Sequence, residues 1–386
     1  MKINLNKDQQ KIVKSPDKNI FLLAGAGSGK TRVIVERIKY LINHNIKPAS
    51  ILCITFTNKS SKEMKKRISN QEVSVFTFHS YCYSILKEIK EFKIFEFNNE
   101  FTENEILQIT NYKNSLKQIK KPSIYERYQK YLKERDLLDY DDLIDQALPL
   151  IKNHNYKYIF IDEFQDTNYL QYEIIKKLAL KDINIVAVGD PDQAIYSFRG
   201  AKVSLIEKFV KDFKAKTYKL EINYRSNPLI LKAANNLIKN NLNRYKKNLI
   251  TNKDIINIPY IYLFDEDIID LKLVNFIRKK RLINAVILYR NDYQVIKLKQ
   301  YLKRNYLFFV KLMTFHEAKG LEFNDCIIYK PEILPFDKDN IFSNKEEERR
   351  LLFVGITRAI NNLYIFTSKL TPFIKETKIK IRRKTL

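Results

Sequence analysis

The feature that most constrains this chain is residues 20–31, IFLLAGAGSGKT. An apolar run leads into three glycines at alternate positions, followed by Lys30, Thr31 and a helical pattern, VIVERIKYLI. This order predicts a buried strand, a loop that turns backbone N–H groups around phosphate oxygens, and a helix whose N-terminus faces the loop. Glycine suits such a loop because a Cβ would collide with the phosphate. A chance glycine-rich turn is the weaker alternative, because GKT directly follows an apolar strand.

The loop predicts a nucleoside triphosphate site that also holds Mg²⁺. Lys30 would reach the β- and γ-phosphates, and the Thr31 hydroxyl would ligate the metal. Ala24 stands at the first position of the G-x-x-x-x-G-K-[ST] pattern, where glycine is usual. The residues expected to hold the nucleotide here are Ala24, Gly25, Ala26, Gly27, Ser28, Gly29, Lys30, Thr31 and Arg32.

A second apolar run, YIFIDEFQDT, ends in two acidic residues. Asp162 and Glu163 would lie at the carboxyl end of a strand, where ligands collect in parallel sheets. Asp162 suits Mg²⁺ coordination, and Glu163 can polarise the attacking water. Acidic residues often cap strands, so the pair gains its meaning from the phosphate loop that precedes it.

A third segment, VAVGDPDQAIYSFRGA, combines a neutral amide with aromatic and cationic residues. Gln193 can sense the γ-phosphate or orient water. Tyr196, Phe198 and Arg199 can form a platform for bases, at about 1–3 kcal/mol per stacked base. The two rings can equally be core aromatics, and these residues alone leave both interpretations open.

Short apolar strands alternate with helical patterns along most of the chain, which predicts an α/β fold with parallel sheets covered on both faces. The predicted strands are residues 20–24, 51–57, 73–78, 156–162, 183–189, 217–223, 258–264, 285–289, 308–314, 326–329 and 363–367.

The pattern also predicts a division into domains. Residues 1–87 and 151–213 would form the first α/β domain, interrupted by a helical insertion at 88–150 that is charged and rich in Tyr and Lys. Residues 214–368 would form the second. A basic tail, 369–386, would follow, and a frayed solvated end is favoured over phosphate contact there.

The composition favours a polyanionic partner without proving one. Lys and Arg number 70 against 44 Asp and Glu, a formal charge of +26, which suits nucleic acid. A codon bias toward lysine explains the excess equally well. Cys53, Cys82 and Cys326 are isolated, so neither a disulfide framework nor a zinc site is indicated. The N-terminus lacks an apolar signal region and no membrane-length apolar run occurs, which predicts a cytoplasmic protein without membrane contact.

Taken in order, AGAGSGKT, DEFQDT and GDPDQAIYSFRGA resemble the UvrD/Rep/PcrA family of superfamily 1A DNA helicases. Five more segments resemble motifs of that family: ITFTNKSSKEMKKRI, VFTFHSYCYSIL, LEINYRS, MTFHEAKGLEF and EEERRLLFVGITRA. The likeness covers nearly the whole chain. It implies two RecA-like P-loop domains and an ATP- and Mg²⁺-dependent motor on single-stranded DNA that moves 3′ to 5′ and unwinds tailed duplexes.

The resemblance assigns roles to further nucleotide-site residues. Gln9 would read the adenine edge, Tyr224 would stack on the base, and Glu322 would contact the ribose. Gly320 would approach the nucleotide. The implied catalytic residues are Lys30, Asp162, Glu163, Gln193, Arg225 and Arg358, the last as an arginine finger. Because Arg225 and Arg358 fall in the second domain, the resemblance implies that hydrolysis depends on domain closure.

The resemblance also implies a set of DNA contacts. Phe198 stands where the family usually has tryptophan, so its base platform would be smaller. His316 can alternatively be a buried structural histidine. The implied DNA-binding residues are Thr55, Phe56, Thr57, Asn58, Phe78, His79, Tyr196, Phe198, Arg199, Thr314 and His316.

One family feature has no counterpart. The family inserts a large helical subdomain shortly before MTFHEAKGLEF, and here residues 303–312 leave no room for it. The chain would then be either a minimal motor or a translocase that needs a protein partner to open duplex. A different class of function also stays open: a DNA-binding or recruitment module with weak ATPase, acting within a repair or defence complex. The complete set of ATP-site residues argues against that module.

Overall fold

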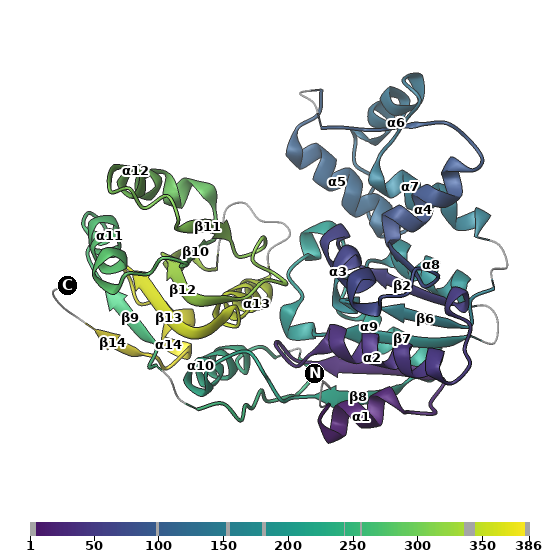
Figure 1. The fold of residues 1–386 in the computed structure, drawn as a ribbon. Helices are drawn as coiled ribbons and strands as arrows, with labels where there is room; N and C mark the ends of the chain where they lie inside the picture. The colour runs from purple at the N-terminus through teal and green to yellow at the C-terminus, as the bar shows by residue number, and fades with distance from the viewer. Residues whose placement is uncertain are drawn as a thin grey trace. The chain divides into compact units, whose positions relative to one another are not determined.

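The computed structural model describes residues 5–97, 100–151, 155–179, 183–242, 244–254, 257–335 and 344–382. The chain divides into two compact units, and each is an α/β unit built on one sheet (Figure 1). The first unit comprises Met1–Ala24, Gly29–Asp190 and Tyr196–Leu220; the second comprises Gly25–Ser28, Pro191–Ile195 and Glu221–Leu386. Two short segments that follow strands of the first sheet therefore belong to the second unit.

The first sheet has six parallel strands in the order β3-β2-β6-β7-β1-β8. Their bounds are β1 Asn19–Ala24, β2 Ile51–Thr55, β3 Ser74–Thr77, β6 Tyr158–Ile161, β7 Asn184–Gly189 and β8 Lys216–Leu220. The central strands are almost continuously buried, as expected where helices cover both faces.

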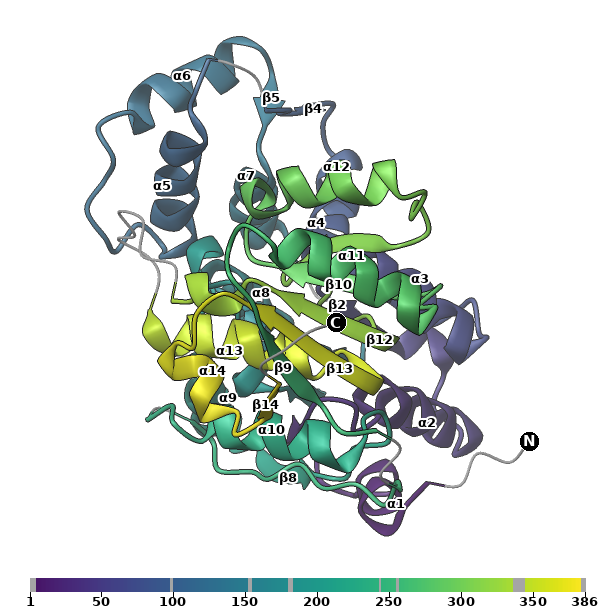
Figure 2. The same cartoon turned by 90° about the vertical axis from the view of Figure 1, so that its left-hand side faces the viewer.

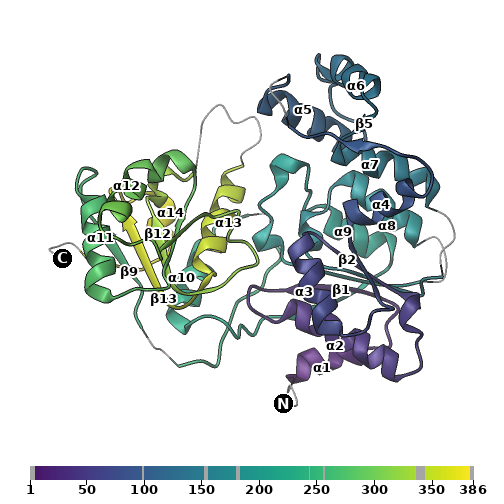
Figure 3. The same ribbon diagram turned by 45° about the horizontal axis from the view of Figure 1, so that its top comes forward.

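Three helices share a core with one face of this sheet: α1 (Lys7–Val13), α2 (Lys30–Asn43) and α3 (Asn58–Ile68). Figure 3 shows them grouped along one side of the strands. Helices α8 (Tyr169–Leu178) and α9 (Leu205–Asp212) supply rings to the other face. There Phe209 of α9 packs against Phe21 of β1, with ring centroids 6.3 Å apart. The sheet is therefore buried on both sides.

The region between β3 and β6 is mainly helical, as the sequence predicts. It contains α4 (Phe78–Lys87), α5 (Glu103–Asn114), α6 (Tyr125–Glu134) and α7 (Tyr140–Ala147), grouped at one end of the first unit in Figure 1. Two-residue strands β4 (Lys93–Ile94) and β5 (Leu137–Leu138) pair beside them. This part has a small core of its own around Phe101 and Tyr128.

The second sheet also has six parallel strands, in the order β11-β10-β12-β13-β9-β14. Their bounds are β9 Tyr260–Leu263, β10 Val286–Tyr289, β11 Lys311–Thr314, β12 Phe323–Tyr329, β13 Ala359–Thr367 and β14 Lys380–Arg382. Figure 2 shows α11 (Ile269–Lys280) and α12 (Ile296–Arg304) on one face, and α10 (Pro228–Ile238), α13 (Lys345–Ile356) and α14 (Pro372–Glu376) on the other. The predicted α/β class with two parallel sheets is confirmed.

Short 3-10 turns complete the description: Pro48–Ser50, Leu148–Leu150, Phe164–Asp166, Pro191–Gln193, Ser197–Arg199, Asp292–Val295 and Pro331–Ile333. Among the helices of the described residues, none combines the length and apolar character needed to cross a bilayer.

Two parts of the fold differ from the sequence-based expectation. Strand β8 pairs with β1, so the chain leaves the first sheet after Leu220 rather than near residue 214. The frayed tail is wrong for residues 372–382, because α14 buries Phe373 and Ile374 and β14 pairs with β9. Those two apolar side chains outweigh the basic composition of the segment. Residues 383–386 of the predicted tail lie outside the described residues.

Candidate nucleotide and nucleic-acid sites

Lys30 and Thr31 begin helix α2 and meet the two acidic residues that follow β6, all within the first unit. Lys30 Nζ lies 3.1 and 3.0 Å from the two carboxylate oxygens of Glu163. The Thr31 hydroxyl donates to Asp162 Oδ2 at 3.4 Å. Burial opposes the charge of Lys30, but Glu163, Asp190 and Asp162 outweigh it and raise the lysine's pKa. The four side chains therefore lie together where α2 begins and β6 ends.

The carboxylates fit a small divalent cation. Burial and the charge of Glu163 raise the pKa of Asp162 to about 6, so a cation beside it would compensate a costly pair of neighbouring charges. No cluster of three acidic, His or Cys ligands exists among the described residues. Mg²⁺ commonly binds through one or two carboxylates, with phosphates and waters completing its shell. Asp162 and the Thr31 hydroxyl suit that mode.

Gln165 connects the acidic strand end to the next strand, and the sequence analysis gave it no role. Its side chain is fully buried, and its Nε2 donates to Glu163 Oε2 at 2.6 Å. Its Oε1 accepts from the backbone N–H of Asp190 at 2.8 Å. Glu163 itself adopts a left-handed φ of 53°. Gln165 and Lys30 both donate to its carboxylate and together fix its position. Position within DEFQDT was the only available signal.

Gln9, expected to read an adenine, lies on α1 in the first unit and is 1% exposed. Its side chain accepts from the N–H of Asn6 at 3.1 Å, while its own N–H donates to Asn6 Oδ1 at 2.7 Å. This reciprocal cap holds the start of α1. A Cβ added to Gly29 would lie 3.1 Å from Gln9 Nε2, so Gln9 lies directly beside the loop.

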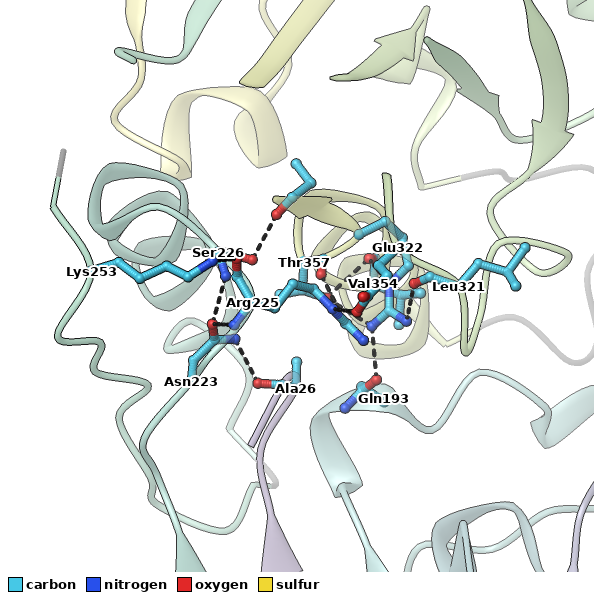
Figure 4. A network of polar contacts seen from close by, with 12 residues as sticks. Ala26, Gln193, Asn223, Arg225, Ser226, Lys253, Leu321, Glu322, Val354 and Thr357 are labelled. Atoms are coloured by element: carbon cyan, nitrogen blue, oxygen red, sulfur yellow. Dashed lines mark hydrogen bonds and ion pairs between the residues drawn. The ribbon is translucent and has the colours of Figure 1, made fainter. Parts of the chain in front are cut away.

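In the second unit, the phosphate-loop segment Gly25–Ser28 packs against the residues after β8 (Figure 4). Asn223, 1% exposed, donates from Nδ2 to Ala26 O at 2.7 Å. Its Oδ1 accepts from the N–H groups of Arg225 and Ser226 at 2.8 and 2.7 Å. The N–H of Tyr224 donates to Gly27 O at 2.9 Å. Asn223 thus joins the loop to the turn that carries Tyr224 and Arg225, a role that the sequence analysis missed.

The guanidinium of Arg225 is held by a carboxylate and a backbone carbonyl. Its Nε donates to Glu322 Oε2 at 2.7 Å, and its Nη1 donates to Thr357 O at 3.2 Å (Figure 4). Glu322 is largely exposed, so this ion pair can exchange for a phosphate at low cost. Tyr224 is 44% exposed. A Cβ added to Gly320, at φ +83°, would meet no atom within 4 Å.

Arg358 is buried in the second unit and donates to neutral acceptors. Its Nε donates to Val354 O at 3.1 Å, its Nη1 to Leu321 O at 3.1 Å, and its Nη2 to Gln193 Oε1 at 3.1 Å. Gln193 and Arg358, predicted from distant segments, are in direct contact.

The segment that carries Gln193 is anchored by buried charge. Asp192, 1% exposed, accepts from Lys247 Nζ at 2.6 Å and from Arg244 Nη2 at 2.8 Å. Burial favours the neutral acid, but Lys247 and Arg244 outweigh it and lower the pKa of Asp192. Lys319 Nζ also donates to Gln193 O at 2.8 Å. Pro191–Ile195 is thus fixed to the second unit by three cations, none of which the sequence analysis paired with it.

The predicted DNA-contacting aromatics of the first unit form one cluster. Phe56, just after β2, stacks on Tyr196 with ring centroids 5.3 Å apart and planes at 26°. Tyr196 contacts Phe198 at 5.9 Å, and the Arg199 guanidinium lies 5.5 Å from both rings. A cavity of about 540 Å³ opens beside Phe56, Phe198 and Arg199. Phe56 and Phe198 face this cavity, whereas Tyr196 packs between their rings and is partly buried, so both interpretations stay open for Tyr196.

Several predicted residues surround this cluster with mixed exposure. His79 and Phe78, at the start of α4, line the same cavity. Burial, with a contribution from Arg199, lowers the pKa of His79 to about 4, so its imidazole is neutral at physiological pH. Thr57 caps α3 and is exposed beside Asn58, whereas Thr55 is 1% exposed.

Thr314 and His316 lie in the second unit, at the end of β11 and just beyond it. The Thr314 hydroxyl donates to Glu317 Oε2 at 3.0 Å, and both predicted residues are partly exposed. Arg32, on α2, is also partly exposed, whereas Ala24, Ala26 and Ser28 are buried.

The sequence model of the UvrD/REP helicase N-terminal domain matches residues 5–102 and 88–214. The chain belongs to the UvrD/REP helicase family. The UvrD-like helicase C-terminal domain matches residues 308–370. The family predicted from the ordered motifs is confirmed.

Named relatives of this UvrD/REP chain include the ATP-dependent DNA helicase Rep of Buchnera aphidicola, 35% identical over 356 residues, which cover 76% of this chain and 55% of the relative. The ATP-dependent DNA helicase PcrA of Bacillus subtilis is 36% identical over 353 residues, covering 75% of this chain and 48% of the relative. PcrA of Staphylococcus aureus is 36% identical over 303 residues, covering 64% and 42%. The chain spans about half the length of these relatives.

Proposed function

We propose that this chain is an ATP- and Mg²⁺-dependent motor that moves 3′ to 5′ along single-stranded DNA and unwinds tailed duplexes. The observation that carries the proposal is the cluster of Lys30, Thr31, Asp162 and Glu163, held within hydrogen-bonding distance at the start of α2 and the end of β6. The relatives named as ATP-dependent DNA helicases support the same reaction class.

The geometry suggests how the site changes when ATP arrives. Lys30 is paired with Glu163, and a triphosphate would compete for the ammonium group. Release of the lysine would leave Glu163, still oriented by Gln165, free to polarise a water molecule. Mg²⁺, held by Thr31 and Asp162, would supply charge neutralisation of the phosphates. The salt bridge therefore keeps the base occupied until substrate binds.

Arg358 and Gln193 are proposed to couple hydrolysis to movement. Arg358 donates to neutral acceptors, and its contact with Gln193 Oε1 is a 3.1 Å hydrogen bond. An arginine that reaches the γ-phosphate accelerates hydrolysis by about 10³–10⁵. If Arg358 exchanged its hydrogen bond to Gln193 for one to a phosphate oxygen, hydrolysis would accelerate. The same exchange would release Gln193 from Arg358, and the segment that carries Gln193 continues to Tyr196.

The aromatic cluster is the proposed grip on DNA. Phe56, Tyr196 and Phe198 offer ring faces, and Arg199 offers a cation for phosphate or base. Such combinations bind single strands with little sequence preference. Only a few residues separate Gln193 from this cluster, so ATP sensing and DNA contact share one segment. Thr55, Thr57, Asn58, Phe78, His79, Thr314 and His316 remain proposed contacts.

The direct test is ATP hydrolysis with and without single-stranded DNA. Wild type should show DNA-stimulated hydrolysis, and Lys30→Ala should lose it. Lys39→Ala, on the same helix and pairing with Glu36 at 3.5 Å, is the matched control and should behave as wild type. Equal rates for wild type and Lys30→Ala would end the proposal.

Strand displacement from 3′- and 5′-tailed duplexes tests the motor and its polarity. Hydrolysis with displacement of the 3′-tailed substrate only is the expected result. Hydrolysis without displacement would indicate a translocase that needs a protein partner, and neither activity would favour a binding or recruitment module. The cytoplasm is the proposed location, because Cys53, Cys82 and Cys326 are buried free thiols.

A further inference from the structure

Two helices of the second unit, α11 and α12, end beside each other, and their ends contain none of the motif residues named above. Arg278 Nη1 in the last turn of α11 donates to Asn305 Oδ1, just after α12, at 3.3 Å. Figures 1, 2 and 3 all draw the two helices side by side. We call the surface formed by residues 278–281 and 303–309 the helix-end surface.

The helix-end surface is strongly basic. Residues 271–289 and 293–316 contain no Asp or Glu, although they run through two helices and two strands. Their basic residues are Lys272, Arg278, Lys279, Lys280, Arg281, Lys297, Lys299, Lys303, Arg304 and Lys311. Six of these, at 278–281, 303 and 304, are exposed at the helix ends. Cations suit helix C-termini, but a local absence of acidic residues goes beyond that preference.

Exposed aromatic rings stand within this basic surface. Tyr306 is 79% exposed, Phe308 69% and Phe309 44%, whereas Leu307 and Val310 are buried in the core of the second unit. The buried pair anchors the turn, and the rings of Tyr306 and Phe308 meet edge to face at 6.2 Å. Large exposed aromatics are unfavourable in water and mark interaction surfaces when they gather.

Tyr306 occupies a backbone position that does not favour tyrosine. It follows α12 with φ +57°, and the next N–H, of Leu307, donates to Leu302 O at 3.0 Å. Glycine is the usual residue at such a helix end, and a bulky residue there carries some strain, as at several other non-glycine positions of this chain. The side chain of Tyr306 is 79% exposed, so the core of the unit does not need this ring.

We propose that the helix-end surface binds an unpaired strand of nucleic acid, with Tyr306, Phe308 and Phe309 stacking on bases and the surrounding cations contacting phosphates. Rings interleaved with cations suit a single strand, because the rings can stack on its unpaired bases and the cations can contact its phosphates. The bases of a duplex are already stacked and paired, so they would not be available to the rings. The proposal rests on the proposed function in taking nucleic acid as the partner, but it assigns a surface that none of the motif residues occupies.

The test measures binding of a labelled oligothymidine strand to the full chain without nucleotide. Tyr306→Gly and Phe308→Ala should each weaken binding about five- to hundredfold, the loss of one stacked base. Tyr306→Gly should keep or raise the thermal unfolding midpoint, because it removes backbone strain. Leu242→Ala removes a side chain that is 91% exposed elsewhere in the unit and should change nothing.

A charge test runs in parallel. The double variant Lys279→Gln/Lys280→Gln should lower the slope of log affinity against log salt by about 1.4, two phosphate contacts of a single strand. Lys232→Gln/Lys239→Gln, exposed cations on and just after α10, which covers the other face of the sheet, is the matched control and should keep the wild-type slope.

Unchanged single-strand affinity in both aromatic variants would overturn the proposal. So would self-association of wild type that Tyr306→Gly abolishes without loss of DNA affinity, because the surface would then join two copies. Equal losses for a blunt duplex would also overturn it, since stacking requires unpaired bases. A wild type without DNA-stimulated ATPase would end the proposed function, yet this comparison would stand because binding is measured without nucleotide.

Discussion

Replacement of Asn223 offers the sharpest test of the link between the phosphate loop and the turn that carries Arg225. One buried side chain supplies three hydrogen bonds there, to Ala26 O and from the N–H groups of Arg225 and Ser226 (Figure 4). Asn223→Ala leaves a carbonyl and two N–H groups without these partners. Because the side chain is 1% exposed, water compensates poorly.

The size of the effect follows from those three groups. Each unsatisfied buried group costs about 1–3 kcal/mol, but one oxygen serves two of them and a water can enter the space, so the sum is not simply threefold. We expect Asn223→Ala to lower the free energy of unfolding by about 2–4 kcal/mol. Asn223→Asp keeps the acceptor for Arg225 and Ser226 but removes the donor to Ala26. It should raise the KM for ATP about tenfold, or about 1.4 kcal/mol, with a smaller loss of stability.

Urea unfolding and steady-state ATPase kinetics measure the two quantities. Asn240→Ala is the control, because that side chain donates to Asn236 O at 2.8 Å at the exposed end of α10. Wild-type stability of Asn223→Ala together with a wild-type KM for Asn223→Asp would refute the reasoning. Stability loss without a KM change in Asn223→Asp would limit Asn223 to a structural role.

Three further outcomes follow from buried groups. Burial, and then the charge of Asp139, raise the pKa of Asp141 from 3.8 to about 7. The ionised carboxylate is therefore unfavourable in the folded state, and the stability falls as the pH rises from about 4 to about 7. Asp141→Asn should raise the urea midpoint at pH 8 and leave it unchanged at pH 4. Asp192→Asn leaves the buried Lys247 beside a neutral partner and should cost about 3–5 kcal/mol in urea unfolding, unless Lys247→Met is present too. Gly355→Ala places a Cβ 2.5 Å from a ring carbon of Phe315. It should lower the free energy of unfolding by about 1–3 kcal/mol, seen as a lower thermal midpoint, and Phe315→Leu should restore part of the loss.

The strands that could be predicted accurately are those whose own residues are mostly apolar, because such a run indicates a buried strand without knowledge of its neighbours. β1 and β7 are apolar after their first residue, an asparagine in each, and their predicted bounds agree with the observed ones to within one residue. β8, KTYKL, and β14, KIR, are edge strands with exposed charge at several positions. Their place in a sheet depends on the neighbours β1 and β9, which no local pattern reveals. For this reason β8 was expected in the second domain and β14 in a frayed tail.

The same distinction applies to the candidate sites. The meeting of Lys30 with Glu163 could be predicted, because parallel strands align their carboxyl ends. Asp192 with Lys247, and Asn223 with Ala26, could not, because ordinary Asp and Asn side chains carry no sign of a partner 55 or 197 residues away. Sequence thus indicates the residues suited to meet ATP and DNA. The residues that hold them in place emerge only from packing.

Gly27 connects these observations in a final prediction. Among the described residues, non-glycines with positive φ lie between +47° and +65°, whereas Gly29, Gly200 and Gly320 lie at +82° or +83°. Gly27, at +64°, has a backbone that other residues of this chain adopt, so conformation alone does not demand glycine there. Its surroundings do, because a Cβ would lie 2.5 Å from Asn223 Nδ2.

Gly27→Ala should therefore be costly in wild type and less so when Asn223→Ala is already present. We expect a coupling energy of about 1 kcal/mol or more from the double-mutant cycle in urea unfolding. The added Cβ would also lie 2.9 Å from Arg225 Cβ, so Asn223→Ala should relieve only part of the cost of Gly27→Ala. Gly320→Ala is the matched control: it bears backbone strain in open space, so its effect should add to that of Asn223→Ala within about 0.5 kcal/mol. Additive effects for Gly27→Ala as well would mean that the loop does not rest on Asn223 in solution.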